Sequence, residues 1–187
     1  MVEFEADDAL ATAAARWERE NSLEQIVLCS PDKDLSQCVR GTRVVMLDRQ
    51  REKVLDEEGV LEKFGVPPGS IPDWLALVGD PADGIPGLPG WGKKSAAQVL
   101  THYQHLEEIP VDPVNWVIQV RHSQTLAKTF NRLKSEALLY RQLATLREDV
   151  PLEQDLDDLR WDGVQHSQLK ALRQELGFPR FLEQISF

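Results

Sequence analysis

The segment GDPADGIPGLPGWGKKSAA, residues 79–97, decides the fold. Glycines and prolines form a dense turn, and two lysines then open an Ala-rich helix expected at 93–103. Gly90 and Gly92 permit positive φ and close backbone approach, and the unpaired N–H groups of the first helical turn can hold a phosphate. The pattern is typical of a helix–hairpin–helix that contacts a DNA backbone without reading sequence. The alternative is an ordinary tight turn between two helices.

Helical patterns surround this segment on both sides. Residues 57–64 form an amphipathic helix that stops at Gly65, and the following Pro67-Pro68 prevents its continuation. Pro72 stands in the first turn of the next helix, where proline is tolerated. The expected helices are 57–64, 71–78, 93–103, about 123–140, 164–176 and 179–185, and residues 144–146 are expected to be extended.

The N-terminal part has a different order of expected elements. A helix at 6–20 precedes two short apolar strands at 25–29 and 43–47, and an edge strand is expected at 53–55. This alternation predicts an α/β layer with a parallel sheet. We therefore place a boundary between an α/β part, 1–56, and a helical part, 57–187.

Seven carboxylates fall in three short clusters. They are Glu5, Asp7 and Asp8; Asp32 and Asp34, just past a strand; and Asp80 and Asp83, which open the glycine-rich turn. Ligand sites form at the carboxyl ends of strands in open α/β sheets. Carboxylates drawn together there need cations, and hard ions such as Mg²⁺ or Mn²⁺ favour carboxylate oxygens. The alternative for each single cluster is that it caps a helix.

The charge distribution and the composition restrict the partners and the cellular location expected for this chain. The net charge is −10, yet the segment from Pro113 to Arg147 carries six basic residues and one acid, so it can meet phosphates or serve as a solvated helix face. Cys29 and Cys38 lack metal-ligand spacing and are interpreted as reduced, packed thiols, with zinc binding or a catalytic thiol as alternatives. No membrane span or export signal is evident, which predicts a cytoplasmic protein.

Three stretches in this order resemble the structure-specific 5′-nuclease family: EADDALATAA, SPDKDLSQ and LVGDPADGIPGLPGWGKKSAAQVL. That family includes the exonuclease domain of bacterial DNA polymerase I, phage exonucleases and flap endonucleases. The likeness runs from Val2 to about Leu182. It implies a PIN-like nuclease core followed by a helix–three-turn–helix region, and two-metal hydrolysis of DNA phosphodiesters in the direction 5′→3′.

The resemblance also implies residue roles. Glu5 and Asp7 would hold a first metal; Asp32, Asp34 and Asp80 a second; Asp8 and Asp83 would ligate through water or support the site. The hairpin would bind DNA, often with K⁺, through Gly84, Ile85, Gly87, Leu88, Gly90, Trp91, Gly92, Lys93, Lys94 and Ser95. The expected substrate is flapped, nicked or double-stranded DNA of any sequence. A polymerase domain in a longer parent and a nucleoid-associated location are further expectations.

Two departures from the family pattern bear on activity. Gly84 stands where the motif often has Asn. The family's N-terminal portion, with its first-strand Asp and helical arch, has no counterpart in these residues, so we expect the chain alone to be weak or inactive. A non-catalytic DNA-backbone-binding module is the alternative function. A small metal-binding or protein-interaction domain is a third.

Overall fold

The computed structural model describes residues 3–177, which fall into two compact units. The first unit ends at Leu152 and contains the sheet and helices α1–α6; the second begins at Glu153. The second unit contains a 3-10 turn, Asp157–Leu159, and helix α7, His166–Leu176. The helix expected at 179–185 lies outside the described residues.

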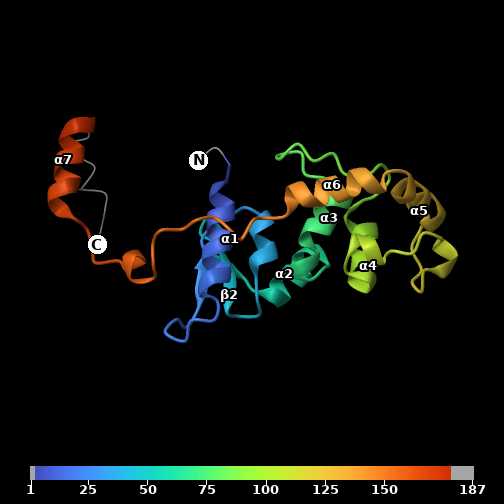
Figure 1. Ribbon diagram of the computed structural model, residues 1–187, viewed down its shortest axis with the longest axis horizontal. Helices are drawn as coiled ribbons and strands as arrows, with labels where there is room; N and C mark the ends of the chain where they lie inside the picture. The colour runs from blue at the N-terminus through green and yellow to red at the C-terminus, as the bar shows by residue number, and fades with distance from the viewer. Residues whose placement is uncertain (1–2, 178–187) are drawn as a thin grey trace. The chain divides into compact units, whose positions relative to one another are not determined.

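A three-stranded sheet forms the N-terminal part of the first unit. Strands β1, Ile26–Leu28, and β2, Val44–Asp48, pair in parallel, and β3, Lys53–Leu55, pairs antiparallel with β2. The predicted α/β layer is confirmed. Helix α1, Ala6–Trp17, packs against β1 and against the 3-10 segment η1, Asp34–Cys38, which links β1 to β2 (Figure 1).

In the helical part, the observed helix bounds agree with the predicted ones where the sequence contains clear capping residues. Helix α2, Glu57–Phe64, begins where the Asp56 carboxylate accepts from the Gly59 N–H (2.9 Å) and ends at Gly65 in the left-handed region. The short 3-10 segment η2, Pro68–Ser70, then leads into the buried helix α3, Ile71–Val78. The glycine-rich turn follows it and leads to α4, Lys93–Tyr103.

One expectation for the later helices was wrong. The single helix at about 123–140 is two helices, α5, Ser123–Arg132, and α6, Lys134–Ala144, which meet at Leu133 outside helical geometry (φ −113°, ψ 28°). The piece expected to be extended at 144–146 departs from the prediction only at Ala144, which ends α6, because Thr145 after it is extended (φ −84°, ψ 117°). Two 3-10 segments, η3, Leu106–Glu108, and η4, Pro113–Asn115, fill the connection between α4 and α5.

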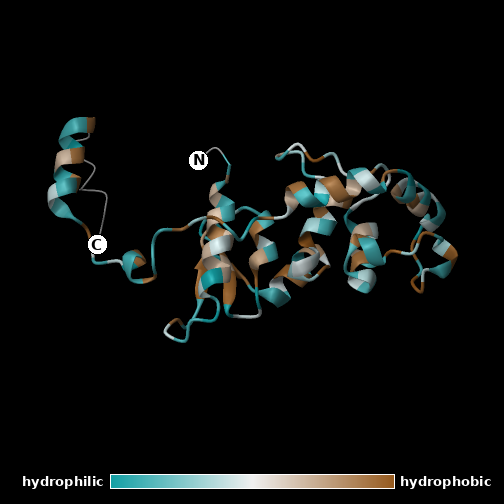
Figure 2. Ribbon diagram, viewed as in Figure 1, coloured by the Kyte–Doolittle hydropathy of each residue, from teal (hydrophilic) through white to brown (hydrophobic). Residues whose placement is uncertain are grey.

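One hydrophobic core runs through the first unit. Every residue from Ile71 to Leu77 is buried, and α4 and α6 pack on α3. The strands are mostly brown in Figure 2, and the helices carry brown and teal on different sides, as amphipathic helices do. Cys38 lies in this core, where burial raises the pKa of its thiol to about 12, whereas Cys29 is exposed and is not the packed thiol expected. Among residues 3–177, none of the helices combines the length and the apolar character needed to cross a bilayer.

A buried carboxylate ties three of the helical elements together. Asp73 of α3 is 2% exposed and accepts from the Leu106 N–H (3.1 Å) and the Arg141 Nη1 (3.3 Å). Its second oxygen lies 3.0 Å from Nδ1 of His105. Because the carboxylate serves η3 and α6 from inside the core, it fixes how both pack on α3.

We predict that Asp73→Ala lowers the free energy of unfolding by about 3 kcal/mol, because it leaves the buried Leu106 N–H without its acceptor and removes one of the two carboxylates that pair with Arg141. Urea denaturation of the whole chain measures it. Asp112→Ala is the matched control, since Asp112 also accepts a backbone N–H (2.9 Å, from Val114) but at an exposed turn. That variant loses about 1 kcal/mol. Equal losses in the two variants would contradict the assigned role of Asp73.

Candidate metal centre and nucleic-acid interface

Three carboxylates from two distant chain segments meet beside the end of β1. One oxygen each from Asp34, Asp80 and Asp83 lies within 4.8 Å of the others. Asp34 opens η1, and its N–H donates to the Asp32 Oδ1 (3.0 Å), which fixes the turn after the strand. The loop after α3 is closed by reciprocal backbone bonds of 2.7 and 2.8 Å between Asp80 and Ile85. Local turns fix the shape of each segment, and the packing of η1 against α3 brings the second and third acidic clusters together.

The first acidic cluster joins them through Asp7. Burial raises the pKa of Asp7, and the nearby charges of Asp32, Glu5, Asp8 and Asp83 raise it further. All three acidic segments thus act on one region of the molecule. Glu5 is the residue that precedes α1. One carboxylate oxygen of Asp32 already accepts a hydrogen bond from the Asp34 N–H within the turn. The division of these residues between a first and a second metal stays a prediction.

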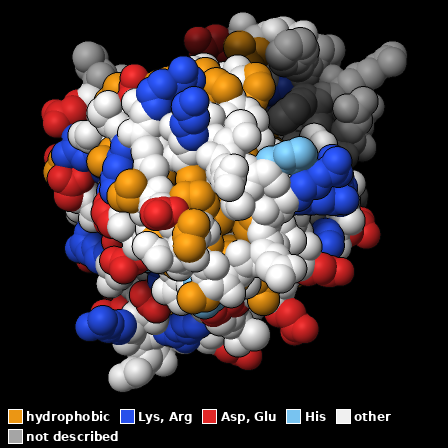
Figure 3. All heavy atoms as spheres, turned by 90° about the vertical axis from the view of Figure 1, so that its right-hand side faces the viewer, with side chains coloured by type: hydrophobic (Ala, Val, Ile, Leu, Met, Phe, Trp, Pro, Cys, Tyr) orange, Lys and Arg blue, Asp and Glu red, His pale blue; other side chains and the backbone are white. Residues whose placement is uncertain are grey.

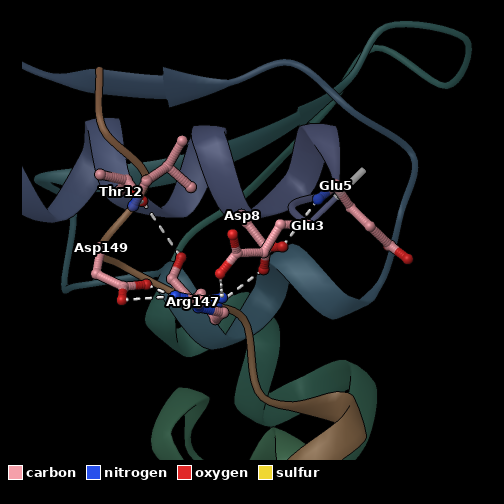
Figure 4. A network of polar contacts seen from close by, with 7 residues as sticks. Glu3, Glu5, Asp8, Thr12, Arg147 and Asp149 are labelled. Carbon is pink, nitrogen blue, oxygen red and sulfur yellow. Dashed lines mark hydrogen bonds and ion pairs between the residues drawn. The ribbon is translucent and has the colours of Figure 1, made fainter. Parts of the chain in front are cut away.

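Asp8 has a structural role. Its Oδ2 accepts from the Glu5 N–H (2.9 Å) and its Oδ1 from the Arg147 N–H (2.8 Å), as Figure 4 shows. The side chain is 9% exposed. Because both carboxylate oxygens accept from backbone N–H groups, Asp8 caps α1 and anchors a segment that lies 139 residues further along the chain. Helix capping was the alternative to metal binding for each acidic cluster, and for Asp8 it is combined with support of the site.

We call residues 147–152 the strap, because they run along α1. Thr12 donates to the Arg147 carbonyl (3.3 Å) and accepts from the Val150 N–H (3.2 Å). The Arg147 guanidinium makes two 2.8 Å bonds to Asp149 and one of 3.2 Å to Glu3 (Figure 4). The strap ties the end of the helical part back onto the α/β part.

These contacts correct the expectation for the basic segment 113–147. Arg147 pairs with Asp149 and Glu3, and Arg141 pairs with Asp73 and Glu107. Both arginines therefore form ion pairs with carboxylates of the protein itself. The segment's other basic residues, Arg121, Lys128, Arg132 and Lys134, remain candidates for phosphate contacts. Viewed from the α5 end of the unit, basic and acidic side chains are interspersed around an apolar centre (Figure 3).

The carboxylates at the centre are unevenly compensated, because the pKa of Asp80 is lowered by the hydrogen bond from Lys33 in spite of burial, whereas the pKa values of Asp34 and Asp83 are raised. Burial raises the pKa of Asp34 to about 7, against the opposing effect of Lys33, and the charges of Asp32, Asp83 and Asp80 add to the rise. The hydrogen bond shared with Asp80 raises the pKa of Asp83. Asp34 Oδ1 is buried without a hydrogen-bond partner. A hard divalent cation fits this donor set, because it would supply the missing charge and accept oxygen ligands.

The glycine-rich hairpin packs tightly against the end of α3. Gly87 has φ +69°, and a Cβ placed there would lie 2.5 Å from the Gly79 nitrogen. The Leu88 N–H donates to the Leu77 carbonyl (2.9 Å), and the indole N–H of Trp91 donates to the Leu126 carbonyl (3.2 Å). The backbone of the hairpin is therefore rigidly placed beside Asp80.

The residues predicted to bind DNA divide into two groups. The side chains of Ile85, Leu88 and Trp91 are buried, 4–6% exposed, so they anchor the hairpin in the core, and only their backbone is left to meet a ligand. Lys93 and Lys94 are exposed in the first turn of α4, which Ser95 caps by accepting from the Gly92 N–H (3.0 Å). Sequence reasoning missed this division because burial is a tertiary property.

A cavity joins the hairpin to the carboxylates. It holds about 430 Å³, and its lining includes Lys33, Lys63, Lys93, Asp80, Phe64 and Trp74. Lysines from three separate elements thus surround the space next to the acidic centre. An anion held there would lie beside the proposed metal ligands.

The fold and the site define a class: an α/β domain with a cluster of carboxylates suited to a metal ion, joined to a helical region that presents a lysine-led hairpin. Residues 1–65 match the family profile "5'-3' exonuclease, N-terminal resolvase-like domain", and residues 66–167 match "5'-3' exonuclease, C-terminal SAM fold". The chain belongs to the 5′-3′ exonuclease family, as the sequence motifs predicted. The boundary expected between residues 56 and 57 stays a prediction.

Curated relatives are longer than this chain. It is 34% identical over 192 residues to DNA polymerase I of Bacillus caldotenax, covering 99% of the chain and 21% of the relative. It is 34% identical over 183 residues to a 5′-3′ exonuclease of Aquifex aeolicus, covering 97% of the chain and 59% of the relative. The chain thus spans about a fifth of the polymerase and somewhat over half of the exonuclease.

Solved structures show the same fold. A bacteriophage T5 5′-exonuclease with bound zinc matches with a TM-score of 0.62 at 18% identity, covering 76% of this chain and 50% of that one. A T5 flap endonuclease in a pseudo-enzyme-product complex with DNA and metal ions matches with a TM-score of 0.61 at 17% identity and the same coverage. These comparisons confirm the predicted PIN-like core with its helical region.

We predict that Gly87→Ala destabilises the protein by about 3 kcal/mol, because the new Cβ meets backbone atoms and the residue also has positive φ. Gly84→Ala is the control: it has a similar φ, +71°, but nothing lies within 4 Å of its Cβ position. It should lose about 1 kcal/mol. Thermal and urea unfolding of both variants measure the difference. Similar losses would show that the close approach of the hairpin to α3 is not tight.

Proposed function

We propose that this chain is the metal-centre and duplex-binding part of a 5′→3′ exonuclease/flap endonuclease that hydrolyses DNA phosphodiesters. The observation that carries the proposal is the meeting of Asp34, Asp80 and Asp83 immediately beside a hairpin whose helix opens with two exposed lysines. Family membership and the phage structures support it. The whole activity belongs to longer relatives, which is why it is proposed for this chain.

Mg²⁺ or Mn²⁺ is the proposed cofactor. Bound divalent ions in such a centre activate water and stabilise the leaving oxygen of an in-line displacement. Asp34, Asp80 and Asp83 would hold one ion, with Asp32 beside them. Asp7 and Glu5 would serve another. Asp8 and the strap would hold the start of α1 in position, so that Asp7 faces the shared region.

Duplex DNA is the proposed partner, bound without sequence preference. Lys93 and Lys94 would contact phosphates, together with backbone N–H groups of the hairpin, because such contacts carry no base information. K⁺ at the hairpin is part of the same proposal. The cavity beside Lys93 leads toward the carboxylates, so a backbone held at α4 would pass the metal centre.

The sheet offers a reason for weak activity by itself. Among the described residues β1 pairs only with β2, so its other edge is open for a further strand. We propose that a preceding strand carrying an acidic ligand, together with a helical arch, completes the site in the family's longer members. A fused polymerase domain and a cytoplasmic, nucleoid-associated location are proposed from the DNA polymerase I relatives alone. The alternative, a non-catalytic DNA-binding module, would keep the hairpin and bind without cleavage.

We predict that this chain cleaves 5′-flap DNA weakly or not at all. A fusion with the N-terminal portion of the Aquifex aeolicus relative should cleave it only with Mg²⁺ or Mn²⁺. In the fusion, Asp80→Asn should slow cleavage at least about a hundredfold, because misplacing an ion has a cost of that order. Asp112→Asn, on an exposed turn, is the control. Robust cleavage by Asp80→Asn would reject the metal assignment; binding without cleavage by the unaltered fusion would favour the alternative.

We also predict that replacing Lys93 and Lys94 with Glu weakens duplex binding about tenfold for every sequence and lowers the salt slope by about two, since each phosphate contact releases counterions. Fluorescence anisotropy over a salt series measures both quantities. Replacing the exposed Arg49 and Lys53 with Glu changes the net charge equally and serves as control. Sequence-specific binding, or an equal loss in the control, would be incompatible with backbone contact at α4.

A further inference from the structure

Lys33 lies within the acidic centre. Its ammonium forms an ion pair with Asp80 Oδ2 and lies 3.8 Å from Asp34 Oδ1. Both oxygens are buried. Among the described residues, Lys33 is the basic residue that forms ion pairs with these two oxygens.

We propose that Lys33 is an internal counter-ion of the metal centre, and that a divalent cation must displace its ammonium to bind. The inference rests on the proposed function, because it assumes that Asp34 and Asp80 bind a metal. It adds that metal loading is an exchange of one cation for another at the same oxygens. Lys33 then sets the metal affinity of the site.

Electrostatics requires the exchange. Three carboxylates within 4.8 Å repel one another, and an ammonium beside two of them offsets that repulsion when no metal is bound. A divalent ion needs the same oxygens at a little over 2 Å, which leaves no place for a second cation between them. The free energy of the Lys33 ion pairs is consequently subtracted from the free energy of metal binding.

The surroundings give the displaced ammonium a path. The Lys33 side chain is 33% exposed, so part of it is open to solvent. It also lines the 430 Å³ cavity shared with Lys63 and Lys93. The displaced ammonium can therefore turn into that space, whereas the backbone turn at Asp32 and Asp34 stays in place.

Calorimetry with Mn²⁺ tests the exchange. Lys33→Met keeps the length of the side chain and removes the charge; it should bind Mn²⁺ about tenfold more tightly than the unaltered chain, equivalent to about 1.4 kcal/mol. Lys63→Met is the control, since it lines the same cavity and changes the net charge equally, but its nitrogen lies over the Phe64 ring at 4.9 Å. Its affinity should stay within about twofold if long-range charge contributes little.

Two further measurements cover other outcomes. In wild-type chain, the reactivity of Lys33 toward an amine-modifying reagent, followed by mass spectrometry, should rise with Mn²⁺ and reach its midpoint at the calorimetric Kd. Lys33→Gln repeats the affinity test if circular dichroism shows that Lys33→Met is unfolded. Unchanged or weaker binding in the Lys33 variants, or unchanged Lys33 reactivity, would overturn the exchange while leaving metal binding intact. Failure of every form to bind Mn²⁺ would reject the proposed metal centre itself.

Discussion

Repulsion among the clustered carboxylates is the constraint on which the structure depends. Bringing Asp34, Asp80 and Asp83 within 4.8 Å is unfavourable unless the backbone is held and the charge is compensated. The backbone is held by the turn after β1 and by the paired bonds between Asp80 and Ile85. Lys33 compensates part of the charge, and burial raises the pKa of Asp34 in spite of that compensation. A stable scaffold with an unsatisfied anion is what a cation site requires.

Helix α3 carries that scaffold because it faces protein on every side. Its residues from Ile71 to Leu77 are buried, its Asp73 binds η3 and α6, and its C-terminal end meets the hairpin where Gly79 and Gly87 nearly touch. The same helix therefore places the acidic loop and the lysine-led start of α4. The position of the acidic loop relative to Lys93 and Lys94 is set by this one buried element.

Local signals in the sequence predicted much of this arrangement. The bounds of α2 followed from Asp56 and Gly65, and the motif order identified the family, because caps, turns and motifs are read from neighbouring residues. Long-range contacts could not be read in that way. The break at Leu133, the pairing of Arg141 and Arg147 with acids, and the burial of Ile85, Leu88 and Trp91 all depend on residues far along the chain. Lys33 was visible in the sequence, but only the fold shows that it faces Asp80.

The strap has a consequence for the order of folding. Its bonds to Asp8 and Thr12 join residues 135–139 positions apart, so the chain between them must be nearly folded before they form. Contacts of such high sequence separation slow folding, whereas the helices that they enclose are local and form early. The strap is thus expected to dock after the folding nucleus, so its bonds would govern how fast the first unit opens more than how fast it assembles.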